Sequence, residues 1–415
     1  MSDLTSLLIA LMWVGLFMKP KMKKYILSVC TLLLPLAALA QLNGSGYYRV
    51  QNYNTKRYIS IVGDYANIGA NTADLESIKM LAGTTDEEFE ENVSWNPATL
   101  CYFESAGGNK WNLKGGGMDL YQKTGYYLNI DRLSKLSTDK EKKYGAIGTY
   151  TLYGKVSSTG MTATRYISDF SKWHINYDYG FPAVDFERRY WNIIPVTQDA
   201  GQYLGIKTEM QADSYYWTTM YAHFPWKPGE GMKAYWVSKV ENGYAILKEL
   251  TEVPEATPVL IRCSSNVVAN NKVTLLTSTS VSKPGSNYLA GVYFCNPTND
   301  KYRKVTPYNS TTMRMLAVDG DGKLVFTNSN TGISYIPANK AYLDMENFLK
   351  HHTHTYPTLQ VITEEDYIAG ISTVEMDPQV KQKGVYNLNG QRVADSTEGL
   401  SCGIYIVNGR KVVIK

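Results

Sequence analysis

Aromatic side chains gather in the middle of the chain, and their chemistry suits the binding of a ligand. The rings that we expect to contact it are Tyr216, Trp217, Trp226 and Trp236. Flat rings stack on sugar faces, and rings with a polar edge are frequent at protein interfaces. Neighbouring residues of a strand point to opposite faces, so about half of these rings must pack inward. Trp226 is flanked by prolines in a predicted turn, which predicts that it is the most exposed of them.

Histidines cluster at one place in the chain, as His351, His352 and His354. Alternate residues of an extended chain share a face, so these imidazoles are candidate ligands for zinc or copper. The sequence places no cysteine or acidic ligand beside them. We favour a solvated loop as the interpretation, and we expect no cofactor.

The motifs of common catalytic sites are missing. The sequence holds neither the Gly-x-Ser-x-Gly elbow of α/β-hydrolases nor the His-Glu-x-x-His pair of zinc proteases. The acidic run around Glu88, Glu90 and Glu91 is typical of a solvated loop. We therefore predict no catalytic residues, and we favour a noncatalytic protein over a hydrolase whose site is assembled from distant residues.

The N-terminus has the pattern of a secretory signal. A basic patch over 19–24 precedes an apolar run, which closes on a small-x-small site that ends at Ala40. This pattern defines a signal peptide, predicted over 1–40 with cleavage between Ala40 and Gln41. Residues 1–21 are predicted to precede the true start. The apolar run is shorter than the roughly 20 residues of a membrane helix, so we expect no membrane span in the mature chain.

Net charge bears on the class of partner. The whole chain carries a formal net charge of +4, and most of the basic excess lies in the signal region. Removing that region leaves the mature chain near neutral. No basic field is left to attract nucleic acid, so we expect no nucleic-acid partner.

The cysteines of the mature chain are Cys101, Cys263, Cys295 and Cys402. An oxidising exterior permits disulfides. The pair Cys263–Cys295 is the first candidate, because both residues are predicted in one domain. Buried thiols are the alternative, and the pairing stays open.

Strand-forming residues and tight turns predict an all-β chain. Asn-Gly and Asp-Gly pairs supply the positive φ angles of hairpin turns. They separate short apolar runs at Asn242-Gly243, Asp321-Gly322, Asn389-Gly390 and Asn408-Gly409. The predicted divisions are a β-trefoil-like domain over 41–200, a β-sandwich region over 201–370, a linker over 371–383 and a small antiparallel β domain over 384–415.

The opening of the mature chain resembles a family of sugar-binding domains. Short strands and Gly-rich turns there fit a compact barrel. The phrase YYRVQNYNTKRYISI over 47–61 resembles the strand pair of ricin-type trefoil lectins. The resemblance implies a β-trefoil fold and, as an expectation, carbohydrate binding.

The end of the chain resembles the C-terminal sorting domain of type IX secretion cargo in Bacteroidetes-type bacteria. The phrases GVYNLNGQRV over 384–393 and GIYIVNGRKVVIK over 403–415 carry the resemblance. In that family an outer-membrane translocon reads this domain, and the cargo is released or attached to the surface. The resemblance implies the translocon as a partner, and periplasmic transit to an extracellular or outer-membrane surface location. The positions that we take as the sorting motif are Gly403, Tyr405, Gly409, Lys411 and Lys415.

The stretch over 216–237 resembles a β-rich module common in secreted proteins of the same bacteria. Together these features predict a secreted or cell-surface noncatalytic binding protein, adhesin-like, whose ligand is a glycan or a host protein. The alternatives are the hydrolase considered above and a structural module of an extracellular assembly. A concave polar pocket would argue against the structural module.

Overall fold

Strands dominate the computed structural model of this chain, which confirms the all-β expectation. The structure describes residues 42–63, 78–116, 118–119, 128–158, 161–170, 174–178, 188–197, 202–297, 303–329, 332–351, 354–372, 384–388, 390–407 and 410–414. The chain divides into two compact units, Met1–Val361 and Ile362–Lys415.

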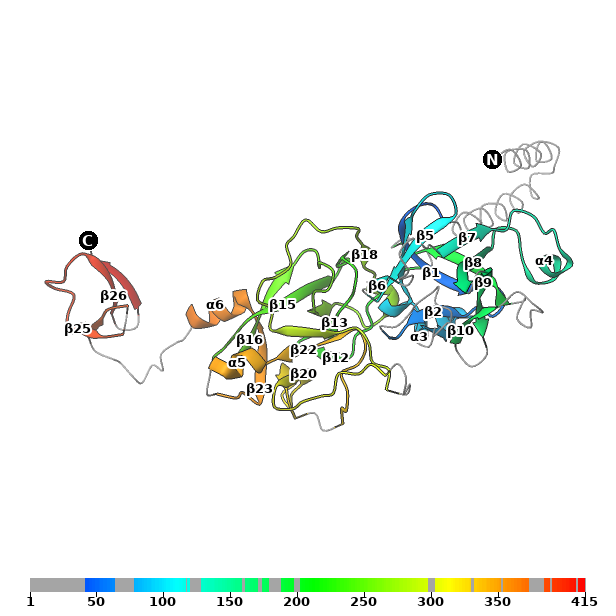
Figure 1. Cartoon of the computed structure of the whole chain (residues 1–415). Helices are drawn as coiled ribbons and strands as arrows, with labels where there is room; N and C mark the ends of the chain where they lie inside the picture. The colour runs from blue at the N-terminus through cyan, green and yellow to red at the C-terminus, as the bar shows by residue number, and fades with distance from the viewer. Residues whose placement is uncertain are drawn as a thin grey trace, which may run out of the picture. The chain divides into compact units, whose positions relative to one another are not determined.

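An 11-stranded sheet forms the first part of the first unit (Figure 1). Its strands are β1 (Gly46–Asn52), β2 (Tyr58–Ile61), β3 (Ile78–Leu81), β4 (Cys101–Ser105), β5 (Lys110–Gly115), β6 (Met118–Asp119), β7 (Leu128–Arg132), β8 (Tyr150–Ser158), β9 (Met161–Phe170), β10 (His174–Asp178) and β11 (Tyr190–Pro195). Antiparallel pairing runs from β1 to β4, β5, β7, β8 and β11, and then back to β1. These described strands therefore close into a ring, and closure removes the exposed edges of a sheet.

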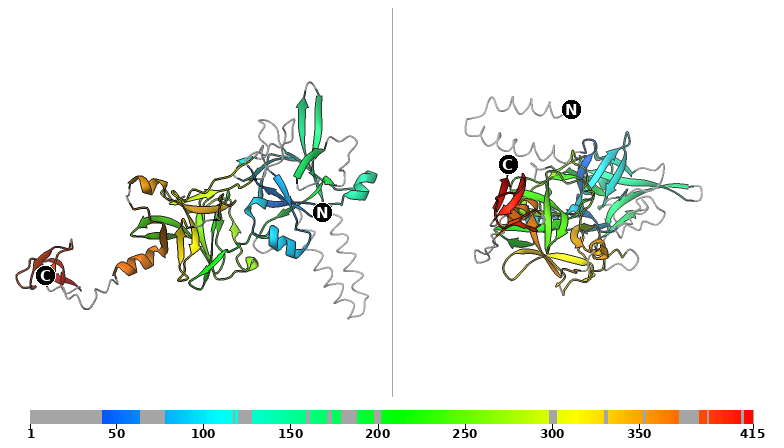
Figure 2. Two further views of the ribbon diagram at one scale, coloured as in Figure 1. Left: turned by 90° about the horizontal axis from the view of Figure 1, so that it is seen from below. Right: turned by 90° about the vertical axis from the view of Figure 1, so that its left-hand side faces the viewer.

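The ring encloses a core rich in aromatic side chains. All of its strands contribute to one buried cluster, whose members include Tyr48, Val50, Phe103, Trp111, Leu128, Leu152 and Trp191. Side chains alternate between the two faces of a strand, and in β1 this alternation points Tyr48 and Val50 inward. Strands β8 and β9 are longer than the others of this sheet, and their hairpin extends beyond the body of the ring (Figure 2).

A 10-stranded sheet forms the rest of the first unit. Its strands are β12 (Met210–Ala212), β13 (Tyr215–Met220), β15 (Met232–Glu241), β16 (Tyr244–Leu250), β17 (Val259–Cys263), β19 (Leu289–Val292), β20 (Met313–Val318), β21 (Leu324–Thr327), β22 (Lys340–Asp344) and β23 (Thr358–Thr363). A separate short pair consists of β14 (Trp226–Lys227) and β18 (Thr274–Leu275). Side chains from β13 to β17 meet those from β19 to β23 in one buried cluster, so the sheet folds over a shared core. The other face of β13, β15 and β17 packs into a second cluster.

A fully buried arginine ties β1 to two other segments of the chain, one before β4 and one after β11. Arg49 lies on β1 and is 0% exposed. Its guanidinium donates hydrogen bonds to the carbonyl oxygens of Tyr203 (2.8 Å), Val93 (3.1 Å) and Ser94 (3.3 Å), and to Thr99 Oγ1 (3.0 Å). The rigid fork of donors thus satisfies acceptors on separate segments. Burial lowers the pKa of Arg49 to about 10, so the side chain stays charged at neutral pH.

Short helices accompany the strands, and one of them corrects a prediction. They are α3 (Asp86–Asn92), α4 (Asp139–Tyr144), α5 (Glu346–His351) and α6 (Glu364–Ser372), with 3-10 turns η1 (Pro97–Thr99) and η3 (Val268–Asn270). The acidic run with Glu88, Glu90 and Glu91, predicted as a solvated loop, forms α3. The Thr85 side chain caps this helix by accepting from Glu88 N, and Phe89 is buried. Acidic residues in the first turn also complement the positive end of the helix dipole.

The second unit carries a 4-stranded antiparallel sheet in the order β25–β24–β26–β27. Its strands are β24 (Val385–Tyr386), β25 (Arg392–Ala394), β26 (Gly403–Val407) and β27 (Arg410–Ile414). Val385 is fully buried, whereas Leu388 and Val413 are exposed. The C-terminal region is therefore antiparallel β structure, as the sequence predicts.

The hairpins predicted from Asn-Gly and Asp-Gly pairs are confirmed. β15 turns into β16 at Asn242 and Gly243, which both have positive φ, as a type I′ turn requires. β20 pairs with β21, β24 with β25, and β26 with β27. In the longer loop between β20 and β21, Gly322 has a positive φ.

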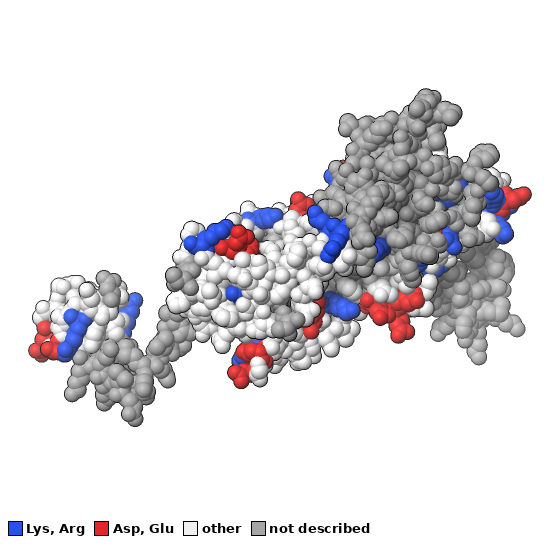
Figure 3. Space-filling model, turned by 60° about the horizontal axis from the view of Figure 1, so that its bottom comes forward, with Lys and Arg blue, Asp and Glu red and all other residues white. Residues whose placement is uncertain are grey.

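Some predicted features fall outside the described residues. They are the signal peptide over 1–40, its cleavage site at Ala40 and Gln41, and the part of the linker over 373–383. Within the described part, no helix is long and apolar enough to cross a membrane. On the face shown in Figure 3, acidic and basic side chains are interspersed among large uncharged areas.

Replacing Arg49 should destabilise the first unit. Arg49→Met keeps much of the volume but leaves buried carbonyl oxygens without donors. We therefore expect the free energy of unfolding to fall by about 3 kcal/mol, measured by urea denaturation of the full chain. Arg132→Met, at an exposed position, is the control and should change it by less than about 0.5 kcal/mol. Equal stability of the two variants would contradict the role given to Arg49.

Candidate functional site

The tryptophan predicted to be the most exposed is buried. Trp226 lies on β14, is 1% exposed and packs in one cluster with Phe224 and Ile261. Its backbone pairs with Val253 on one side and with Leu275 of β18 on the other. The exposure predicted for Trp226 is therefore wrong, because pairing on both sides draws its ring into the core.

The other predicted rings are divided between two faces of the sheet. Trp217 is 7% exposed and belongs to the cluster at the shared core of the folded sheet. Tyr216 and Trp236 are half-buried and pack against the cluster that contains Trp226. The structure therefore does not bring the four predicted rings, Tyr216, Trp217, Trp226 and Trp236, to one surface.

The predicted histidine cluster is only partly described. His351 is the last residue of α5 and is exposed, His354 is also exposed, and His352 lies outside the described residues. The ring of His354 lies 5.9 Å from that of Tyr356. Among the described residues, no group of three or more His, Cys, Asp and Glu side chains could hold a metal ion.

The residues of the predicted sorting motif lie in the second unit. Gly403 and Tyr405 belong to β26 and are half-buried, and Lys411 is exposed on β27. The Tyr405 hydroxyl donates to the carbonyl oxygen of Ser401 (3.0 Å). Gly409 and Lys415 lie outside the described residues.

The cysteines Cys101, Cys263, Cys295 and Cys402 are free thiols. The candidate disulfide between Cys263 and Cys295 is therefore not formed. Cys263 packs in an apolar cluster, whereas Cys295 lines the cleft described next. Burial raises the pKa of the Cys101 and Cys263 thiols to about 12.

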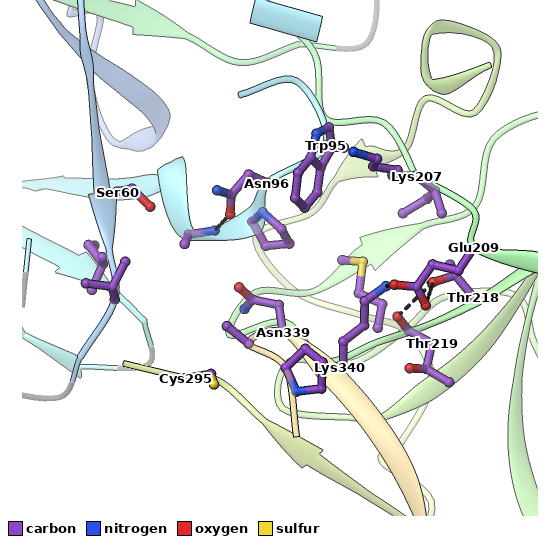
Figure 4. Close-up of a pocket in the computed structure, with 18 residues that line it drawn as sticks. Ser60, Trp95, Asn96, Lys207, Glu209, Thr218, Thr219, Cys295, Asn339 and Lys340 are labelled. Atoms are coloured by element: carbon purple, nitrogen blue, oxygen red, sulfur yellow. Dashed lines mark hydrogen bonds and ion pairs between the residues drawn. The ribbon is translucent and has the colours of Figure 1, made fainter. Parts of the chain in front are cut away.

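A cleft of about 410 Å³ lies between the first part of the first unit, which holds the 11-stranded sheet, and the part with the 10-stranded sheet (Figure 4). The first part contributes polar and aromatic groups from Ser60, Trp95 and Asn96. The other side contributes Lys207, Glu209, Thr218, Asn339 and Lys340. Ligand sites occur preferentially where two parts of a fold meet, so this cleft is the first candidate for a functional site.

Local hydrogen bonds position the side of the cleft that holds Trp95 and Asn96. Trp95 Nε1 donates to the carbonyl oxygen of Glu91 in α3 (2.6 Å). Asn96 caps η1, and its Oδ1 accepts from Ala98 N (3.0 Å). This bond leaves the Nδ2 amide of Asn96 to donate to a ligand. The ammonium of Lys207 lies 4.6 Å from the centre of the Trp95 ring, in a cation–π contact.

The sheet side of the cleft holds three polar groups in mutual contact. Lys340 Nζ lies 2.8 Å from Glu209 Oε1 and donates to Thr218 Oγ1 (2.7 Å). The Thr218 hydroxyl donates in turn to Glu209 Oε2 (3.1 Å). The side chain of Lys340 is 19% exposed and that of Glu209 is 47% exposed. Burial lowers the pKa of Lys340, and the Glu209 carboxylate opposes this shift.

A tight turn places Asn339 at the cleft. Asn339 has a φ of 57°, a left-handed conformation that asparagine tolerates better than most residues. Its Nδ2 donates to the carbonyl oxygen of Tyr221 (3.3 Å), and its own carbonyl oxygen accepts from Tyr221 N (2.9 Å). The Tyr221 ring stacks on Tyr293 (4.1 Å between centres) and leaves no room for a side chain at Gly291, where a Cβ would lie 2.1 Å from it.

A second depression, of about 540 Å³, lies on the ring. Two of its polar side chains already bond each other, since Asn109 Nδ2 donates to Asp131 Oδ1 (2.7 Å), and Asp131 Oδ2 also accepts from the Tyr153 hydroxyl nearby (2.9 Å). The aromatic side chains that line this depression, Trp111 and Tyr150, are buried in the core. It is therefore the weaker candidate.

The described lining of the cleft offers few groups for acid–base chemistry. Among the described residues that line it, Glu209 is the only carboxylate and there is no histidine. Hydrolysis of a glycosidic bond by the usual route needs two carboxyl groups. The Glu209 carboxylate is occupied by Lys340 and Thr218.

Sequence reasoning missed this cleft. Its groups come from Trp95, Lys207, Glu209, Asn339 and Lys340, which are far apart along the chain. The local signals were turns: Trp-Asn-Pro begins at Trp95, and Pro-Ala-Asn-Lys ends at Lys340. These signals predict where the chain bends, but not that the two bends face one cleft.

Comparison with known proteins adds no assignment, because no family model, no curated protein and no solved structure matches this chain.

His223 lies further along the segment that holds Tyr221. Its ring packs edge-on against Phe224 (5.0 Å between centres) and Tyr293 (6.3 Å). Both ring nitrogens are shielded from solvent, and neither has a hydrogen-bond partner among the described residues. Burial lowers the pKa of His223 to about 4, although the nearby Leu100 backbone opposes the shift.

The stability of the chain should therefore fall in acid because of His223. A histidine in the unfolded chain has a pKa of about 6.5. As pH drops from about 6.5 toward 4, His223 binds a proton in the unfolded state but not in the folded state. Protonation therefore favours the unfolded state, and the free energy of unfolding falls across that pH range. We expect the melting temperature of His223→Phe to fall less than that of the wild type between pH 7 and pH 4. The exposed His354 supplies the control, His354→Phe, which should keep the wild-type profile. Parallel profiles for wild type and His223→Phe would refute this.

Proposed function

We propose that this chain is a secreted or cell-surface, noncatalytic binding protein whose ligand is a glycan held in the cleft. The observation that carries the proposal is the mixture of groups at one site: the Trp95 indole, the amides of Asn96 and Asn339, and the Lys340–Glu209 pair. Sugars combine hydroxyl groups with apolar ring faces, so this mixture is complementary to them. The volume of about 410 Å³ lies within the range of small-molecule pockets.

A binding function fits this cleft better than the alternatives. A glycoside hydrolase of the usual kind needs a second carboxyl group facing Glu209, and the described lining residues supply none. A concave polar cleft is not expected in a purely structural module. The alternative ligand for such a binding protein is a host protein instead of a glycan.

The finer architecture and the export route belong to the same proposal. The closed ring supports a β-trefoil-like fold for 41–200, and the sheet folded over a shared core supports a sandwich for 201–370. Residues 1–40 would direct the chain across the inner membrane, and 384–415 would present it to a type IX-like translocon. The protein would then reach the outside of the cell or the outer-membrane surface.

Glycan binding should depend on Trp95. The full chain is screened on a glycan array at physiological salt, and the selected glycan is then titrated against variants. Trp95→Ala removes the ring from the cleft, and we expect affinity to fall by about tenfold. Tyr215 is 37% exposed and does not line the cleft, so Tyr215→Ala is the control and should bind as wild type. Absence of selective binding to any glycan would overturn the proposal, and an equal loss in both variants would place the site elsewhere.

A further inference from the structure

The cleft holds more positive than negative charge. Its charged lining residues in the described part of the chain are Lys207, Lys340 and Glu209. The Glu209 carboxylate pairs with Lys340 (2.8 Å). Lys207 is exposed and rests on the Trp95 ring, and no carboxylate of a described residue lies within ion-pair distance of it. One ammonium at the cleft is therefore left without a negative partner.

The two ammonium groups act on each other. Lys207 and Lys340 line the same cleft (Figure 4). Burial is the largest cause that lowers the pKa of Lys340, and repulsion from Lys207 adds to it. Like charges that share a partly buried site cost free energy, which a bound anion would recover.

Uncharged groups of the cleft suit the sugar that would carry such an anion. The Nδ2 of Asn96 can donate, and the Oδ1 of Asn339 can accept, because the other atom of each amide already bonds the protein. The Lys340–Glu209–Thr218 group presents further polar atoms. Hydroxyl groups of a sugar ring can satisfy both kinds of atom.

We infer that the cleft selects glycans with an anionic substituent, a carboxylate or a sulfate, and that Lys207 is the residue that pairs with it. The inference rests on the proposed glycan binding and narrows it to a ligand class. Lys340 and Glu209 compensate each other and recognise hydroxyl groups, so they discriminate little between neutral and acidic sugars. Lys207 carries the uncompensated charge, so the selectivity follows from it.

The experiment measures the affinity of the full chain for matched oligosaccharides. These are a uronic-acid oligosaccharide, a sialylated one and a sulfated one, each with its neutral counterpart. We expect the wild type to bind an anionic member at least about tenfold more tightly than its neutral counterpart. Lys207→Gln should bring the ratio of anionic to neutral affinity close to one, because the loss falls mainly on the anionic member. The preference should also shrink as salt is raised, because the contact is partly exposed.

The matched control is Lys272→Gln. Lys272 also rests on an aromatic ring, with its ammonium 4.4 Å from the centre of the Tyr203 ring, but it does not line the cleft. This variant should keep the preference for the anionic glycan. Cys295 lines the cleft and allows the site to be located independently. Cys402→Ser removes the exposed thiol. In this variant, bound glycan should slow the alkylation of Cys295.

The outcomes separate this inference from the proposal on which it rests. A preference for carboxylated or for sulfated glycans supports the inference and identifies the anion. Equal binding of neutral and anionic members, or a preference that survives Lys207→Gln, overturns the inference and leaves glycan binding standing. Failure to bind any of the oligosaccharides or any arrayed glycan overturns both.

Discussion

No carboxylate of a described residue forms an ion pair with the buried guanidinium of Arg49, and backbone carbonyl oxygens from separate segments accept its hydrogen bonds instead. Removing a charge from water costs several kcal/mol, which such a group recovers only if its donors are satisfied. Arg49 therefore requires that the chain at Val93 and Ser94 and the chain at Tyr203 stay where they are. The bond from Gly205 N to the Ser94 carbonyl oxygen (2.9 Å) ties the same two segments together directly.

The two sides of the cleft begin at these segments. Ser94 is followed at once by Trp95 and Asn96, and Tyr203 is followed shortly by Lys207 and Glu209. The segments that carry Trp95, Asn96, Lys207 and Glu209 are therefore anchored close by through the buried charge of Arg49. A site supported in this way keeps its geometry without a ligand, which lowers the entropy lost on binding.

The features that the sequence predicted correctly depend on local chemistry. Asn242 and Gly243 form a hairpin because the turn itself needs positive φ. Short strands and turns indicate a barrel there, but they could not predict which strands close it, because β1 pairs with β11 at the other end of that region. The error at Trp226 has the same origin: neighbouring prolines indicate a turn, but pairing with Val253 and Leu275 decides its burial. The cleft joins residues such as Trp95 and Lys340, whose separation in the chain no local pattern spans.

The state of the cysteines has a consequence for how the protein matures. A thiol reacts with oxidants as its thiolate, and the raised pKa of Cys101 and Cys263 leaves almost none of that form at neutral pH. At neutral pH these two buried thiols are therefore poor targets for oxidants, and an oxidising compartment would leave them unchanged. Cys402, exposed just before β26, is the described thiol at which oxidation would join two copies of the protein.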